Sequence, residues 1–285
     1  MDPAMLVKLV LVAGIVLIVI SIGVRSRPED TLQLIRNPRL GVRAMTAMFI
    51  AVPAFVLFIT WLIPFDVPVR AALLALAVSP MPPIIPRKEI NIGGDANYAI
   101  GLQVLGTVFS IVAVPFMLMA VALVFGVSGS FDPFAMSKLL VITVGAPLVI
   151  GMAIGRLRPD WRDPVALWAG KLGTWALIGG SVVVLFGTWQ TMLALIGGGV
   201  LVTIVAIIGF ALAVGHWLGG PDEGNRGALA VACAARHPGV AIALSTTVFP
   251  ERQVEITGAV LLFLLVNLVV TVPYQKWRQK VAAQG

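Results

Sequence analysis

Charged residues are scarce in this chain and cysteine is nearly absent. Asp, Glu, Lys and Arg make up 12% of the 285 residues, whereas 59% are hydrophobic, and the mean hydropathy is +1.00. Soluble domains carry about 25% charged residues, so the composition excludes a soluble globular protein. The single cysteine, Cys233, excludes an intrachain disulfide. The net charge of +7 indicates membrane topology rather than nucleic-acid binding, because the basic residues lie in short loops.

Sequence motifs for intramembrane chemistry are also missing. The chain has no Gly-x-Ser-x-Gly, no His-Glu-x-x-His and no Asp-rich pair within an apolar stretch. We therefore expect neither an enzyme nor a metal centre, and no cofactor. A transporter and a non-transporting membrane receptor or scaffold remain as the two function classes.

Apolar stretches of about 20 residues recur along the whole chain and predict an all-α membrane protein with one transmembrane domain, residues 1–285. None of them has the alternating pattern of an outer-membrane barrel. The nine predicted spans are 5–24, 42–63, 68–93, 95–126, 136–155, 165–188, 191–216, 226–248 and 254–275.

The distribution of Lys and Arg predicts the orientation of the chain in the cell (inner) membrane. With the N-terminus outside and the C-terminus in the cytoplasm, the outer loops carry only Arg70, Lys138 and Arg252. The other basic loop residues then face the cytoplasm, as the positive-inside rule requires. The lipid bilayer is the expected partner, and the oligomeric state is not predicted.

Two spans are interrupted at membrane depth. The third contains Pro80, Pro82, Pro83 and Pro86, which remove backbone donors and clash with the preceding turn. The eighth contains Arg236-His237-Pro238-Gly239 within a run of small residues. Unwound backbone at this depth must be buried or line a watery cavity, and an intramembrane charge indicates a functional site.

The two halves of the chain resemble each other weakly around these interruptions. Arg70-Ala-Ala-Leu73 resembles Arg226-Gly-Ala-Leu229, and the same offset pairs Pro82 with Pro238. Val114-Pro115-Phe116 also resembles Val272-Pro273-Tyr274. The eighth span comes five places after the third, and this odd offset makes the two copies antiparallel. The pattern therefore predicts an inverted repeat, in which broken helices mark the binding site of a transporter.

The chain resembles the bile acid:sodium symporter family over nearly its whole length. The similar residues are Arg27-Pro-Glu-Asp30, Asn37-Pro38, Ser79-Pro80, Gly94-Asp95, Arg226 and Pro238-Gly239. The resemblance implies a panel domain and a core domain, with the two broken helices crossing in the core near sodium and substrate. It implies secondary active transport of a small organic anion.

The sodium ligands of that family are replaced in this sequence. The ligand positions fall on Met48, Ile85, Pro86 and Ala232, and Arg236 and His237 stand where the family has Gln and Asn. Sodium symport and a sodium-independent carrier, either proton-coupled or a uniporter, both stay open. We hypothesise that Arg236 supplies a tethered positive charge in place of sodium and attracts the anion.

The candidate substrate-binding residues are those at the interruptions and on the neighbouring spans. They are Pro82, Pro86, Arg87, Asp95, Asn97, Gln103, Thr107, Arg236, His237 and Pro238.

Each of these roles has a structural alternative. Arg236 could instead pair with a buried Asp95 or Glu89, and His237 could carry a coupled proton or only a structural hydrogen bond. Arg87 could be a gate or an orientation signal. Gln103, Thr107 and Ser110 form one stripe that could line the substrate path or hold helices together.

Overall fold

A computed structural model describes residues 3–26, 34, 36–82, 84–125 and 133–284. Every regular element in these residues is a helix, which confirms the all-α prediction. Six helical stretches of the described residues are long and apolar enough to cross a bilayer. They are α1 (Pro3–Arg25), the continuous α3 (Pro38–Thr46), η1 (Ala47–Ala51) and α4 (Val52–Leu62), α7 (Ala96–Phe125), α10 (Arg162–Ala194), α11 (Val200–Leu218) and α14 (Gln253–Ala282).

The remaining three predicted spans consist of shorter helices. The third is α5 (Val67–Val78) followed by α6 (Ile85–Asn91), and the eighth is α12 (Glu223–Ala234) followed by α13 (Pro238–Val248). These two interruptions lie where the prolines predict them. The fifth is α8 (Pro133–Leu140), η2 (Val141–Gly145) and α9 (Ala146–Leu157). Two short 3-10 turns, η3 (Pro159–Trp161) and η4 (Pro250–Arg252), lie in loops.

One predicted boundary is wrong. The sixth span is predicted to end at residue 188 and the seventh to start at 191, but α10 continues to Ala194 and α11 begins at Val200. The turn instead uses Gly198 and Gly199, whose φ angles of 51° and 82° favour glycine. The polar residues Gln190 and Thr191, near the predicted boundary, lie on the last turns of α10.

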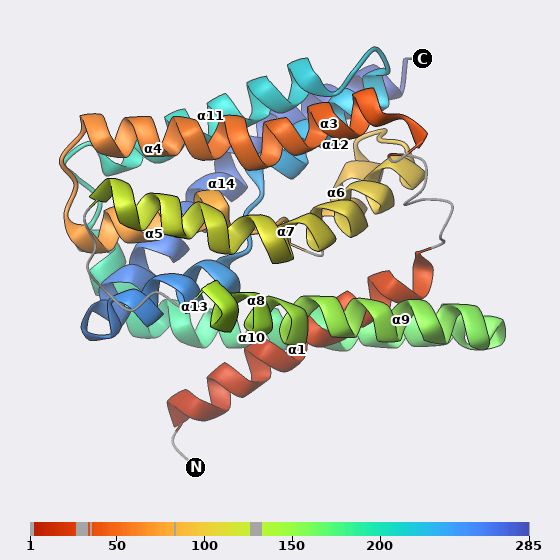
Figure 1. Ribbon diagram of the computed structural model, residues 1–285, viewed down its shortest axis with the longest axis horizontal. Helices are drawn as coiled ribbons and strands as arrows, with labels where there is room; N and C mark the ends of the chain where they lie inside the picture. Colours follow the sequence, from red (N-terminus) through yellow and green to blue (C-terminus); the bar gives the residue numbers. More distant parts are fainter. Residues whose placement is uncertain (1–2, 27–33, 35, 83, 126–132, 285) are drawn as a thin grey trace.

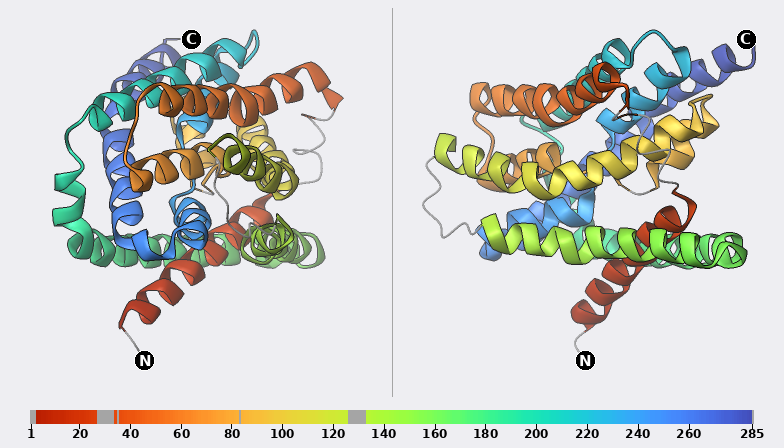
Figure 2. Two further views of the ribbon diagram at one scale, coloured as in Figure 1. Left: turned by 60° about the vertical axis from the view of Figure 1, so that its left-hand side comes forward. Right: turned by 45° about the vertical axis from the view of Figure 1, so that its right-hand side comes forward.

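Helices α1, α9 and α10 form a bundle along one side of the molecule (Figures 1 and 2). We call it the glycine bundle, because backbones meet at glycines. A Cβ atom on Gly23 would lie 2.4 Å from the Leu148 carbonyl oxygen, and one on Gly151 would lie 2.4 Å from the Ile20 carbonyl oxygen. Such close approach between membrane helices requires small residues.

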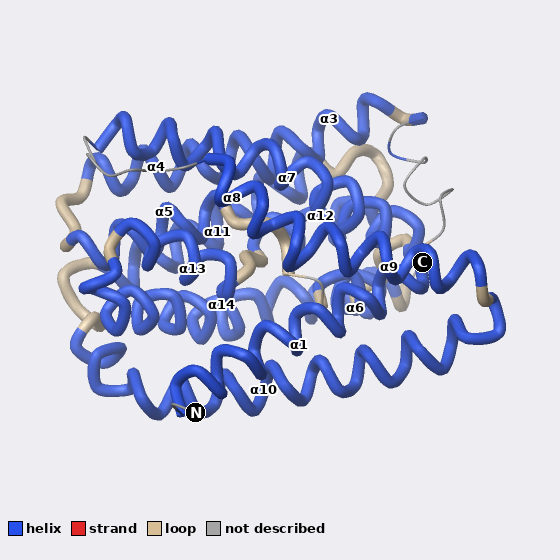
Figure 3. Tube along the Cα trace, turned by 60° about the horizontal axis from the view of Figure 1, so that its bottom comes forward, coloured by secondary structure: helices blue, strands red, loops and turns tan. Residues whose placement is uncertain are grey.

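The other helices form the core bundle, in which α5, α11, α12, α13 and α14 pack around the two interruptions. In Figure 1, α5 and α13 occupy the left half of the molecule and α6 and α12 the right half. The two broken helices therefore run in opposite directions. In Figure 3 the glycine bundle's α1 and α10 lie along the lower edge, beside the core. The interruptions meet in the middle of the core bundle.

Candidate functional site

The candidate site is the place where the two interruptions cross. Helix α5 ends in an extended residue, Ser79, with φ −67° and ψ 148°, and α12 ends in a similarly extended Ala235, with φ −88° and ψ 130°. The chain between α5 and α6 is called the first break, and the chain between α12 and α13 the second break. Ser79, Arg236 and His237 are all buried, at 3% exposure or less.

The first break has backbone carbonyl oxygens that receive no hydrogen bond from its own prolines. Pro80 and Pro82 have no N–H group, so this segment cannot continue the helical hydrogen-bond ladder. The carbonyl oxygens of Ser79, Pro80 and Met81 each accept a hydrogen bond from elsewhere in the core. Buried carbonyl groups require such partners, so the first break depends on donors from other elements.

The second break supplies donors to the first. The backbone N–H of His237 donates to the Pro80 carbonyl oxygen at 3.0 Å and to Ser79 Oγ at 3.1 Å. Arg236 Nη1 donates to the Ser79 carbonyl oxygen at 3.3 Å. The guanidinium therefore lies at the C-terminal end of α5, where the helix dipole favours a positive charge.

Arg236 also reaches a third helix through the π turn η1. Its Nη2 donates to the Met48 carbonyl oxygen at 3.1 Å. That oxygen is available because the Val52 N–H bonds to Ala47 instead, and the next residue, Pro53, has no N–H. One buried cation thus ties the second break to α5 and to η1.

The structural alternative, in which Arg236 pairs with Asp95 or Glu89, is wrong. Among the described residues no carboxylate lies within ion-pair distance of Arg236. Asp95 is exposed, and its side chain accepts the Tyr98 N–H at 2.7 Å and so caps α7. Neither side-chain oxygen of Glu89 has a hydrogen-bond partner among the described residues. Backbone carbonyls take the place of an acid because the prolines and the π turn leave them unsatisfied.

His237 caps α13. Its Nδ1 accepts the Val240 N–H at 3.3 Å, and Pro238 follows at the first position of the helix. This bond assigns the ring proton to Nε2, which is buried without a partner among the described residues. The geometry favours the structural alternative for His237, because protonating Nδ1 would remove the cap.

The two long helices α7 and α14 each brace one break. Gln103 on α7 donates to the Met81 carbonyl oxygen at 3.4 Å and to Thr107 Oγ1 at 3.2 Å. Asn267 on α14 donates to the Ala234 carbonyl oxygen at 2.8 Å. Asn267 is not among the residues predicted from the sequence, although a lone amide in an apolar stretch was the available signal.

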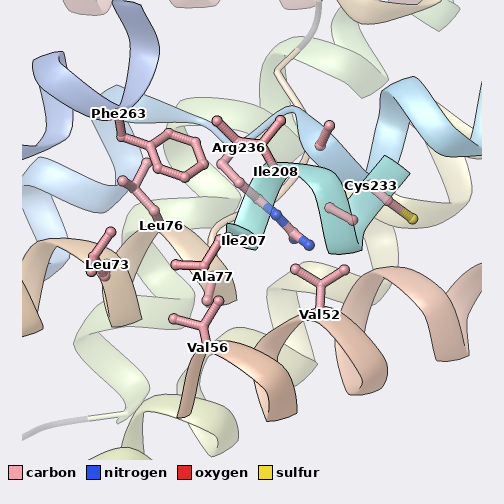
Figure 4. Close-up of a pocket in the computed structure, with 12 residues that line it drawn as sticks. Val52, Val56, Leu73, Leu76, Ala77, Ile207, Ile208, Cys233, Arg236 and Phe263 are labelled. Carbon is pink, nitrogen blue, oxygen red and sulfur yellow. The ribbon is translucent and has the colours of Figure 1, made fainter. Parts of the chain in front are cut away.

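A small cavity lies against Arg236. It has a volume of about 10 Å³, room for roughly one water molecule. Figure 4 shows the Arg236 side chain extended between Ala77 on α5 and Ile207 and Ile208 on α11, with its guanidinium group pointing towards Val52. Arg236 lines this cavity, and its Nε atom has no hydrogen-bond partner among the described residues. An organic anion requires the crossing to open.

The other candidates divide into two groups. Pro82 and Pro238 flank the crossing and are half-buried, and Pro86 is buried in the first turn of α6. Arg87 is exposed on the first turn of α6, and Asp95 and Asn97 are exposed at the start of α7. The structure therefore brings together Gln103, Thr107, Arg236 and His237 with the flanking prolines, but not the last three polar residues.

Comparison with known proteins agrees with the architecture. The model of the sodium bile acid symporter family matches residues 12–211. No curated protein matches the chain. The matched residues include the first break and end within α11, so the second break with Arg236 lies beyond them. Because the match covers more than half of the sequence, the chain belongs to the sodium bile acid symporter family, a family of membrane transporters.

Proposed function

We propose that this chain is a secondary active transporter of a small organic anion, a carboxylate or a sulfonate, which binds beside Arg236. The family supports transport, and no enzymatic activity is proposed. The observation that carries the choice of an anion is the buried guanidinium, whose charge no described carboxylate neutralises. An unpaired charge at membrane depth is costly, so an anionic substrate gains from meeting it.

The proposed carrier does not require sodium. Met48, Ile85 and Ala232, at the family's ligand positions, are buried apolar side chains. The described residues contain no group of three acidic, His or Cys side chains that could hold a metal ion. The carbonyl oxygens of Ser79 and Met48, which could coordinate a cation, already accept bonds from Arg236.

We further propose a single transmembrane domain of nine spans arranged as an inverted repeat. Its support is the correspondence of elements: α5–α6 and α12–α13 run in opposite directions, and α7 and α14 both have 30 residues and one internal proline. An amide side chain on each of these long helices also donates a hydrogen bond to one break. Such repeats place the substrate at their interface.

The proposed orientation places the C-terminus in the cytoplasm. The start of α12 packs on the loop after α6, and the end of α14 packs on the same loop, so these segments form one end of the molecule, the α6–α12 end. The basic residues at this end support the assignment. They are Arg87, Lys88, Arg226, Lys276, Arg278 and Lys280.

The test is anion exchange in liposomes that contain the purified protein. Vesicles loaded with unlabelled methanesulfonate, benzenesulfonate or gluconate are diluted into a trace of the labelled anion, and transient accumulation is measured. Arg236→Gln keeps hydrogen-bond donors but loses the charge, so exchange should fall roughly 30-fold or more. Arg236→Lys keeps the charge without the planar fork and should fall less.

The matched control is Arg252→Gln, which changes an exposed arginine paired with Glu255 and should exchange at the wild-type rate. A monodisperse Arg236→Gln protein that exchanges as fast as the wild type would contradict the anion site.

A further inference from the structure

Glu89 is a buried carboxyl group that the anion site does not use. It lies on α6 and has no exposed surface. Neither Oε1 nor Oε2 receives a hydrogen bond from the part of the chain that the structure describes. An ionised carboxylate without donors is among the most expensive groups to bury. In this conformation the Glu89 side chain therefore carries its proton.

The described residues around Glu89 offer no compensating cation. Helix α6 packs against α7 and α12, and the buried titratable side chains of these two helices are Tyr98 on α7 and Cys233 on α12. The Tyr98 hydroxyl is itself buried without a partner among the described residues.

The other charged groups near α6 point elsewhere. On α6 itself, Arg87 is exposed and Lys88 is half-buried, and Asp95 caps α7 at the surface. Arg278 on α14 reaches Gly227 of α12 but is bonded to Glu223 at 2.6 Å. A proton therefore remains the means of neutralising Glu89 here.

Glu89 and Arg236 together set the charge of the buried core. Among the Asp, Glu, Lys, Arg and His residues that the structure describes, the buried ones are Glu89, Arg236, His237 and Arg278, and Arg278 is paired. Moving an uncompensated charge through a membrane protein is costly. Two states have no net charge in the core: Arg236 with ionised Glu89, and Arg236 with a bound monovalent anion and protonated Glu89.

We propose that Glu89 is the proton-binding site that couples transport to protons, one proton moving with each monovalent anion. This inference rests on the proposed function. On the loading side a proton from water binds a carboxylate oxygen of Glu89 while the anion binds beside Arg236. On the releasing side both return to water. The empty carrier goes back with Arg236 and ionised Glu89, in a conformation other than the described one, where the buried carboxyl keeps its proton. The cycle is electroneutral, because the proton and the anion carry opposite charges.

The position of Glu89 provides a route for this proton. It lies one turn from the exposed end of α6, where Ile90 and Asn91 face outward. The Glu89 carbonyl oxygen accepts the Gly94 N–H, and a Cβ on Gly94 would lie 3.3 Å from Ala228 Cβ on α12. Separation of α6 from α12 would therefore open the carboxyl to water at the α6–α12 end.

The first experiment needs no substrate. Infrared spectra of the purified protein near neutral pH should contain the carbonyl band of a protonated carboxylic acid, which shifts when isotope-labelled glutamate is incorporated. Glu89→Gln should remove this band. Glu255→Gln, which changes an exposed carboxylate paired with Arg252, should keep it. A wild-type protein without a labelled-glutamate band overturns the proposal, whether or not the variant folds.

The second experiment uses the same liposomes with benzenesulfonate, or gluconate if only the carboxylate exchanges. An inward proton gradient should drive accumulation in the wild type, and a membrane potential should not. Glu89→Gln should keep exchange within twofold and lose gradient-driven accumulation. Exchange without any effect of the gradient overturns the proton site but leaves the proposed function standing. Absence of exchange in the wild type for every anion overturns the proposed function.

Discussion

Prolines remove backbone donors from the first break, whereas the second break supplies hydrogen-bond donors. Prolines leave the carbonyl oxygens of Ser79, Pro80 and Met81 without helical partners. The Arg236 guanidinium and the His237 N–H of the second break donate hydrogen bonds to the first break. Neither segment satisfies its own polar groups at this depth, so each stabilises the other. This difference shows that the carbonyl oxygens of a proline-rich break can bind a buried arginine without a carboxylate partner.

The largest expected stability effect comes from removing the atom that joins the breaks most directly. Ser79 Oγ accepts the His237 N–H and donates to the Leu76 carbonyl oxygen, fully buried. We expect Ser79→Ala to lower the free energy of unfolding by about 2 kcal/mol. Ser245→Ala is the control, because that hydroxyl bonds only within α13 and should be nearly neutral. Denaturation of detergent-purified protein would measure both, and equal losses would contradict the joining role.

A smaller loss of stability is expected when either of the hydrogen bonds that brace the two breaks is removed, and the loss should differ between α14 and α7. The Asn267 bond to Ala234 is 2.8 Å long, whereas the Gln103 bond to Met81 is 3.4 Å. We expect Asn267→Leu to cost about 1.5 kcal/mol and Gln103→Leu about 0.5 kcal/mol, because hydrogen bonds between membrane helices span this range. The same denaturation assay decides the order. The reverse order would show that the first break depends more on its brace.

Acid should destabilise the start of the second broken helix. Glu223, at the start of α12, accepts from Arg278, and this hydrogen bond lowers the pKa of Glu223 below its usual value. A lowered folded-state pKa stabilises the fold above the unfolded value of about 4.3, and this contribution disappears as the pH falls through the folded pKa. We expect a small decrease in melting temperature below pH of about 4 that Glu223→Gln no longer shows. An identical acid profile in the variant would contradict this assignment.

The smallest expected effect is that of sodium. If Arg236 already supplies the cation at the crossing, sodium chloride should not raise the melting temperature beyond choline chloride of equal ionic strength. A sodium-specific rise would instead show a site built from carbonyl oxygens and residues such as Gln103. It would restore sodium symport and make Arg236 a supplement to the ion.

The sequence predicted the helical class, the two breaks and their buried cation, because prolines and an intramembrane arginine leave few alternatives. It could not predict that Arg236 bonds to Met48, since the acceptor is a backbone oxygen whose availability follows from the π turn before Pro53. The alternative of a carboxylate partner for Arg236 is wrong for the same reason. The sequence indicates Glu89 only as a possible buried partner of Arg236, and its burial without a partner among the described residues depends on the packing of α6 against α12.

The glycine bundle also bears on how the protein is made. Helix α1 finds its closest partners in α9 and α10, which leave the ribosome long after it. Helix α1 therefore enters the bilayer before these partners are synthesised. It is the most apolar of the six spanning stretches among the described residues. Its small-residue face, with Gly14 and Gly23, stays against lipid until the later helices arrive. Substitutions there would be felt during membrane insertion and assembly, before any solute is carried.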